Sequence, residues 1–157
     1  MAKKYRSTSV FVKPDVRHKS LLLTKFVNCT FHGGKKSVAE RAVYDALDLA
    51  QKKIPGSEPL KILEQAIENV RPLLEVRPRR VGGATYQVPM EVPRPRGTAL
   101  AIRWILEGAR ARKGRPIRAK LAEELLEAYN KQGTAFTKRE NTHKMAEANK
   151  AFAHFAW

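Results

Sequence analysis

Apolar residues recur at steps of three and four over most of this chain, which is the spacing of the buried face of an α-helix. The pattern predicts about six helices in a single domain that is mainly α. The first begins at Ser20, the fourth begins near Gly97, and the last covers roughly residues 138–152. Glycine or proline, which end helices, mark the breaks. These breaks fall at Gly33-Gly34, Pro55-Gly56, Pro72, Gly114 to Pro116 and Gln132-Gly133.

Local signals refine the helix starts and their buried faces. Ser37 stands three residues before Glu40, the capping-box spacing, and Ser57 precedes Pro59, which suits a first helical turn. In the fourth helix, Trp104 shares a face with small and apolar residues and is expected in the core. The other members of that face are Leu100, Ala101, Ile105 and Gly108.

The last helix carries a weaker apolar face, and Met145, Ala148 and Phe152 are expected to point inward. Such a helix either packs on the core or becomes ordered against a partner. Cys29 is expected to be a small core residue.

Residues 73–92 change period, because apolar residues there stand at alternate positions around Gly82-Gly83. This pattern predicts a β-hairpin with a glycine turn. Pro78 and Pro89 fall inside the two strands, so neither strand can be paired on both sides. The sequence therefore predicts a two-stranded β-ribbon, inserted between the third and fourth helices, that needs a surface to lie on. A helical domain would span residues 20–157, after a basic N-terminal arm over residues 1–19.

Charge gives the first indication of function. The 157 residues hold 31 lysines and arginines against 15 acidic residues, a net charge of +16. Most of the excess lies in residues 1–36 and 77–120. Such a field attracts polyanions, of which nucleic acid is the commonest. The apolar runs are shorter than a membrane span requires, and a single cysteine with no signal-peptide pattern suits the cytoplasm.

Three motifs with possible chemistry fail on spacing. The Gly33 to Ser37 stretch is not a phosphate-binding loop. It lacks a glycine five residues before the Gly-Lys pair, and no Ser or Thr follows the lysine of that pair directly. Cys29 and His32 have the offset of zinc ligands but no companions, so no metal and no cofactor is expected. The acidic run Glu123, Glu124 and Glu127 suits a solvated helix face rather than a catalytic site, so no enzyme is expected.

The cationic residues on the ribbon, the fourth helix and the tail favour RNA. Arginine supplies phosphate contacts and Tyr86 a flat face for a base, as in recognition of irregular or single-stranded RNA. The residues expected to bind RNA are Lys3, Lys4, Arg6, Lys35, Lys36, Arg77, Arg79, Arg80, Tyr86, Arg94, Arg96, Arg103, Arg110, Arg112, Lys113, Arg115, Lys138, Arg139, His143 and Lys144. The alternative is an architectural DNA-binding protein, although the ribbon tip Val81 to Ala84 is a poor wedge for base steps.

Five stretches of the sequence resemble the ribosomal protein seven family of the small subunit, in its bacterial type. The longest runs from Arg79 to Pro89, and the others appear in the family's order. These others are Leu23 to Asn28, Gly34 to Ser37, Ala99 to Trp104 and Thr142 to Phe152.

The resemblance implies a protein that binds the 3′ major domain of small-subunit rRNA and starts assembly of the subunit head. It also implies a ribbon near the exit-site tRNA and the mRNA path, with neighbouring ribosomal proteins of the head and platform as partners. No membrane and no homo-oligomer is implied. The expected location is the ribosome in the cytoplasm, or in an organelle if an organelle encodes the chain.

Overall fold

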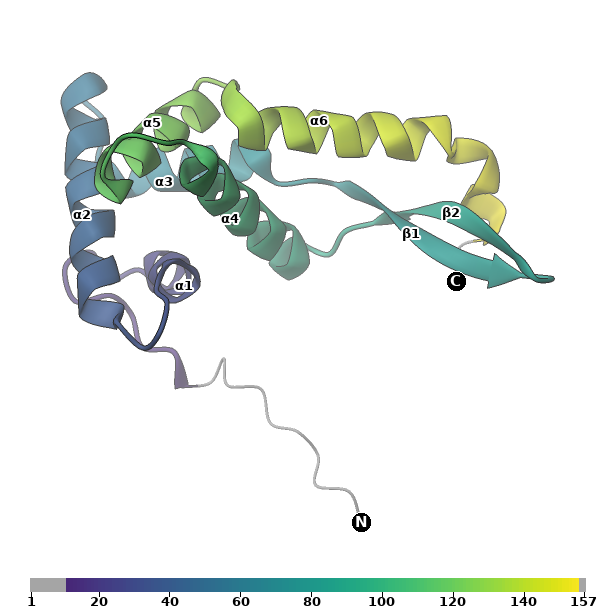
Figure 1. The fold of residues 1–157 in the computed structure, drawn as a ribbon, viewed down its shortest axis with the longest axis horizontal. Coiled ribbons are helices and arrows are strands. Elements are labelled where there is room, and N and C mark those ends of the chain that lie inside the picture. Colours follow the sequence, from purple (N-terminus) through teal and green to yellow (C-terminus); the bar gives the residue numbers. More distant parts are fainter. Residues whose placement is uncertain (1–10, 156–157) are drawn as a thin grey trace, which may run out of the picture.

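The computed structural model describes residues 11–155. A bundle of helices forms the body, and a β-ribbon and the last helix extend from it side by side (Figure 1). The elements in chain order are α1 (Leu21–Thr30), α2 (Lys36–Lys53), α3 (Pro59–Val70), β1 (Leu74–Val81), β2 (Ala84–Glu91), α4 (Arg94–Ala111), α5 (Ile117–Tyr129), α6 (Gly133–Ala148) and the 3₁₀ helix η2 (Lys150–Phe155). The predicted mainly α fold, with a ribbon between the third and fourth helices, is confirmed.

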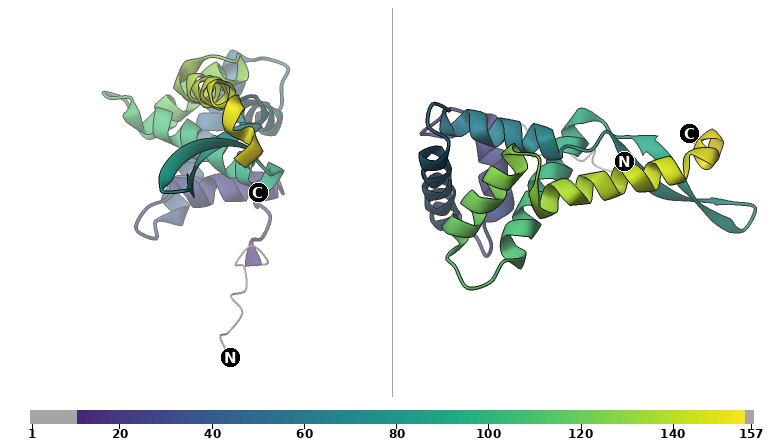
Figure 2. Two further views of the ribbon diagram at one scale, coloured as in Figure 1. Left: turned by 90° about the vertical axis from the view of Figure 1, so that its right-hand side faces the viewer. Right: turned by 90° about the horizontal axis from the view of Figure 1, so that it is seen from above.

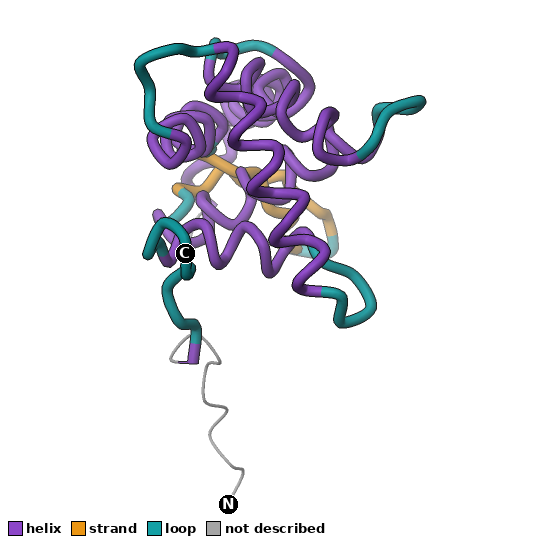
Figure 3. Tube along the Cα trace, turned by 90° about the vertical axis from the view of Figure 1, so that its left-hand side faces the viewer, coloured by secondary structure: helices purple, strands orange, loops and turns teal. Residues whose placement is uncertain are grey.

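The core lies where α1 to α5 meet, which Figure 3 shows from the end opposite the ribbon. Leu23 and Phe26 of α1 pack with Leu47 of α2, Leu63 of α3 and Leu121 of α5, all fully buried. Trp104 is 9% exposed and belongs to this cluster, so its predicted core position is confirmed. Cys29 is exposed, and its predicted core position is wrong because its side of α1 faces an open groove beside α4.

Helix starts follow the sequence signals in part. Ser20 caps α1 as predicted, since its Oγ accepts from the Leu23 amide at 3.4 Å. Ser37 does not cap α2, because the helix begins two residues earlier than that cap requires, at Lys36 directly after the turn at Gly33 and Gly34. Ser57 does not cap α3 either.

The cap position of α3 is Glu58, and Pro59 occupies the first turn as expected. Helix α4 begins at Arg94, ahead of the predicted Gly97. That glycine is buried where α4 meets the end of α3, and a Cβ there would lie 2.9 Å from the Cγ atom of Arg71. Glycine is therefore needed for this close approach.

The ribbon has the predicted hairpin geometry. Strands β1 and β2 are antiparallel, with Leu74 opposite Glu91 and Val81 opposite Ala84. Gly82 and Gly83 both have positive φ, as a two-residue hairpin turn requires. Only these two strands form the sheet within residues 11–155, and α6 lies against both of them. Helix α6 thus provides the surface that the ribbon was expected to need (Figure 2).

The C-terminal helix differs most from the prediction. Helix α6 begins at Gly133, a residue expected to end the preceding helix, and it stops at Ala148. The chain then continues as the 3₁₀ helix η2. Met145 is 54% exposed and Ala148 is exposed, so their predicted inward positions are wrong. The reason is that α6 runs out along the ribbon, beyond the helical body, so this end of it has only the ribbon and η2 beside it (Figure 1).

No helix in the described part of the chain is long and apolar enough to cross a membrane.

Candidate nucleic-acid interface

The outer face of α4 carries cations that the rest of the structure does not neutralise. Arg103 and Arg110 are two helical turns apart and both are exposed. Within residues 11–155 neither forms an ion pair, and Arg110 donates only to the carbonyl of Thr30, at 3.0 Å. That bond ties α4 to the end of α1.

A groove of about 730 Å³ lies beside these two arginines. Ala99, Leu106 and Ala111 give it apolar walls, and Cys29 contributes from α1. Glu107 also lines it, but that carboxylate is paired with Lys138 of α6 at 2.7 Å. Charge at the rim and an apolar interior suit a sugar-phosphate chain with an unpaired base. We call Arg103, Arg110 and this groove the α4 face.

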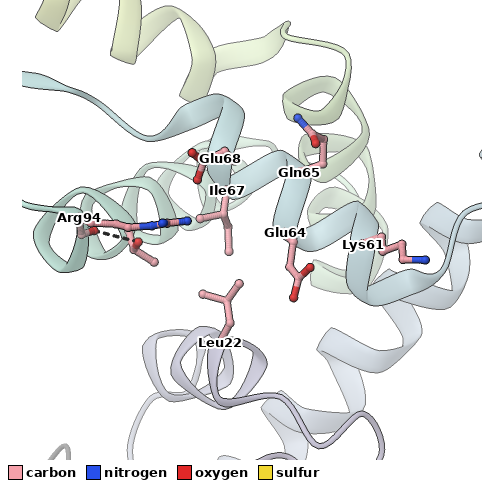
Figure 4. Close-up of a pocket in the computed structure, with 8 residues that line it drawn as sticks. Leu22, Lys61, Glu64, Gln65, Ile67, Glu68 and Arg94 are labelled. Atoms are coloured by element: carbon pink, nitrogen blue, oxygen red, sulfur yellow. Dashed lines mark hydrogen bonds between the residues drawn. The ribbon is translucent and has the colours of Figure 1, made fainter.

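Other predicted RNA-binding cations are also exposed and carry no ion pair in the described structure. They are Lys35 before α2, Arg80 on β1, Arg94 at the start of α4, Lys113 after α4 and Lys144 on α6. Arg94 lines a second pocket, between α1, α3 and α4, whose walls carry both signs of charge (Figure 4). Lys61, Glu64 and Glu68 of α3 lie around it, which makes this pocket a poorer phosphate site than the α4 face.

A second set of predicted RNA-binding residues forms ion pairs and hydrogen bonds within the protein itself. Arg112 lies between three glutamates of α5, at 2.7 Å from Glu124, 2.5 Å from Glu127 and 3.4 Å from Glu123. The bond to Glu127, and then those to Glu124, raise the pKa of the Arg112 guanidinium above its usual value, although burial opposes this. Arg115 pairs with Glu123, so the two arginines share that carboxylate.

The prediction for Glu124 is wrong, because its side chain is fully buried and does not lie on a solvated helix face. It accepts from the Thr134 hydroxyl at 2.8 Å and from the Ala135 amide at 3.0 Å. The carboxylate thus caps the first turn of α6 from α5, and a Cβ at Gly108 would lie 2.6 Å from its Oε1. This explains why α6 begins earlier than its own sequence indicates. Glu124 lies four residues before Ala128 on the apolar side of α5, which is the only signal that could have revealed it.

Glu75 joins two predicted RNA-binding arginines at the base of the ribbon. Its carboxylate is buried, lies 2.6 Å from Arg77 Nε and accepts from Arg96 Nε at 2.9 Å. The link connects β1 to the first turns of α4. Glu75 is the only acidic residue of β1, and this is the sequence signal for its pairing with nearby arginines.

Helix α6 holds the ribbon base from the other side. His143 Nε2 accepts from the Leu73 amide at 3.0 Å, which requires the neutral ring. Burial lowers the pKa of His143, and Arg139 adds to the effect. Arg139 donates to the carbonyl of Asn69 at 2.7 Å and lies over the ring of Phe136, while Lys138 pairs with Glu107 at 2.7 Å.

The remaining predicted residues fall into three places. Tyr86 packs between Phe152 and Phe155 of η2, and Arg79 donates to the Phe155 carbonyl. Lys36 lies 3.7 Å from Glu40 at the start of α2. Lys3, Lys4 and Arg6 of the expected arm lie outside the described residues.

The C-terminal part of the expected N-terminal arm contacts the helical body. Asp15 is buried and accepts from the Tyr44 hydroxyl at 2.5 Å, and Arg17 lies 3.0 Å from Asp48. Burial and then the bond to Asp15 raise the pKa of Tyr44 to about 12. Burial tends to raise the pKa of Asp15, but the bonds from Tyr44 and from the amides of His18 and Arg17 lower it overall.

The architecture and the charge distribution together define a basic helical protein with a β-ribbon arm. The family model described as ribosomal protein S7p/S5e matches residues 2–150. The chain therefore belongs to this family of ribosomal proteins, as the resemblance in its sequence indicated.

Bacterial relatives support this assignment over nearly the full length. The chain is 58% identical over 144 residues to small ribosomal subunit protein uS7 of Rhodopirellula baltica, covering 91% of this chain and 92% of that protein. It is 56% identical over 146 residues to the protein of the same name from Thermotoga neapolitana, covering 93% and 94%. The chain is thus a bacterial-type structural component of the small ribosomal subunit and is located in the ribosome of the cytoplasm.

Proposed function

We propose that this chain binds small-subunit rRNA directly, through the α4 face and the ribbon. The observation that carries the proposal is the exposed pair Arg103 and Arg110 beside an apolar groove, with no carboxylate paired to either in the described structure. Arginine forks recognise phosphates by paired hydrogen bonds, and their charge persists at any cellular pH. A structural role in the ribosome needs such a surface but no catalytic step.

The target of this surface is the 3′ major domain, and binding there starts assembly of the subunit head. The ribbon then lies near the exit-site tRNA and the mRNA path, with other head and platform proteins as neighbours. Family membership supports this placement, and the shape of the molecule is consistent with it. The ribbon and α6 extend from the body and can reach a site that the body does not touch (Figure 2).

The experiment is a titration of the full chain against three nucleic acids of equal length. These are a fragment of the 3′ major domain, a fragment of another rRNA domain and a DNA duplex. The proposal expects the tightest binding to the 3′ major-domain fragment at physiological salt. Equal affinity for all three would mean that the surface binds any polyanion and would contradict the proposal. Tighter binding to the DNA duplex would favour an architectural DNA-binding protein.

A further inference from the structure

Four aromatic rings form a continuous column between the ribbon and the C-terminal segment. The Phe152 ring lies 5.3 Å from Tyr86, Tyr86 lies 5.0 Å from Phe155, and Phe155 lies 4.0 Å from His154, measured between ring centroids. Tyr86 comes from β2 and the other three rings from η2. Figures 1 and 2 show the C-terminal segment turning down onto the ribbon from the end of α6.

The column anchors η2 to the ribbon. Helix η2 has no fully buried residue, but Tyr86, Phe152 and Phe155 are all half-buried against one another. The Arg79 side chain donates to the carbonyl of Phe155 and adds a polar tie from β1. A short 3₁₀ segment is not stable by itself, so these contacts with the ribbon hold it in place.

Among the described residues His154 ends the column, and its ring is both exposed and oriented. Its Nδ1 lies 2.8 Å from the carbonyl of Ala151, a bond that Nδ1 makes only as a donor. This bond fixes the orientation of the ring, whose other edge lies on an exposed side chain. An exposed flat ring that is fixed by a backbone bond and supported by a second ring is preorganised for stacking.

Lys150 begins η2 and supplies a cation close to the column, and η2 contains no acidic residue. Arg79 of β1 adds positive charge beside Phe155, although its side chain is already bonded to the Phe155 carbonyl. Bases that are splayed out of a helix stack on aromatic side chains, histidine among them, while nearby cations hold the phosphates. An aromatic group of a protein partner would gain less from this charge.

We infer that His154 is a stacking platform for an unpaired nucleobase of single-stranded RNA, and that Tyr86, Phe152 and Phe155 hold this platform in place. The inference deepens the proposed function and rests on it, because it assigns the ribbon side of the molecule to an unpaired segment of RNA. It also gives Tyr86 a supporting role in place of direct base contact.

The test uses the full chain and a fluorescently labelled, unstructured RNA heptamer, with the dissociation constant measured by anisotropy. His154→Ala removes the platform and is expected to weaken binding about 5- to 100-fold, the range for loss of one stacked base. His154→Phe keeps a flat ring and is expected to restore most of the affinity. Met145→Ala, which truncates an exposed side chain of α6 outside the column, is the matched control and should bind like the unsubstituted chain.

Two results with the His154 variants would overturn the inference. One is His154→Ala binding the heptamer as tightly as the unsubstituted chain, and the other is His154→Phe binding as weakly as His154→Ala. The same proteins are titrated with the 3′ major-domain fragment. If the unsubstituted chain binds that fragment but not the heptamer, the inference fails and the proposed function stands. If it binds the heptamer but not the fragment, the proposed 3′ major-domain target fails, and only the contact between His154 and an unpaired base is kept.

Discussion

Two groups of arginines from one stretch of chain have opposite surroundings. Arg103 and Arg110 stand exposed on α4 with no carboxylate paired to them in the described residues. Arg112 and Arg115, within five residues of Arg110, are held by glutamates of α5. The comparison teaches that a dense run of cations is not a uniform binding surface. Where a folded neighbour supplies carboxylates, arginine joins two helices, and where it does not, arginine remains available to a polyanion.

The largest effect is expected from breaking the buried pair. Arg112→Gln leaves the carboxylate of Glu124 fully buried with its cation removed, so we expect it to destabilise the fold by about 3–5 kcal/mol. Denaturant unfolding followed by circular dichroism measures this change. Arg115→Gln is the matched control, because its side chain is 63% exposed and its loss should cost at most about 1 kcal/mol. Equal losses of unfolding free energy in both variants would contradict the view that Arg112 holds two helices together while Arg115 forms only a surface ion pair.

A similar loss is expected at Trp104, which lies about 100° around the α4 axis from Arg103 and faces the core. Trp104→Ala removes a large side chain from the core and should cost about 3–5 kcal/mol in unfolding free energy. RNA affinity measured under conditions where this variant remains folded should be unchanged. Weaker binding by the folded variant would show that the core side of α4 also shapes the RNA surface.

The contact between Asp15 and Tyr44 gives a smaller effect with a defined pH dependence. The pKa of Asp15 is lowered in the folded protein, so its contribution is present above the usual value of 3.8 and is lost as the pH falls through the folded value. The pKa of Tyr44 is raised from 10.0 to about 12, so its contribution is present below pH 10 and is lost as the pH approaches 12.

Tyr44→Phe removes the hydroxyl that donates to Asp15 and should cost about 1–3 kcal/mol near pH 7. The loss should shrink toward both pH limits, since the contact no longer stabilises the unsubstituted chain there. Denaturant melts at acidic, neutral and alkaline pH measure the difference. A difference that stays constant across pH would mean that the hydroxyl acts by packing alone.

The smallest effect is expected at the ion pair between Lys138 and Glu107. Both side chains are largely exposed, so Lys138→Gln should change the unfolding free energy by less than about 1 kcal/mol. Thermal and denaturant melts at low and high salt are the measurement. A larger loss would indicate that this pair, like Arg112, holds two helices together.

Periodicity predicted the helices, the hairpin and the buried position of Trp104, because each depends on a repeat within one short segment. The start of α6 could not be predicted in this way. It depends on Glu124, which reaches the Ala135 amide from another helix. Local spacing likewise could not show that Tyr86 meets Phe155, since the two are brought together only when η2 folds back onto the ribbon.

The candidate site was predicted by composition more than by geometry. Clustering of arginine located the α4 face, and the structure shows Arg103 and Arg110 exposed there. Nothing in the spacing separated them from Arg112, whose partners lie on α5, or from Arg96, whose partner Glu75 lies on β1. Which cations are neutralised is a property of tertiary packing, so the sequence could list the candidates without sorting them.

RNA binding by the double variant Arg103→Gln, Arg110→Gln at several salt concentrations tests the α4 face most directly. We expect its stability to stay within about 1 kcal/mol of that of the unsubstituted chain, since both residues are exposed. We also expect weaker binding to the 3′ major-domain fragment and a log–log salt slope flattened by about 1–2 units. A stable double variant with unchanged affinity and slope would contradict the assignment of the α4 face to rRNA.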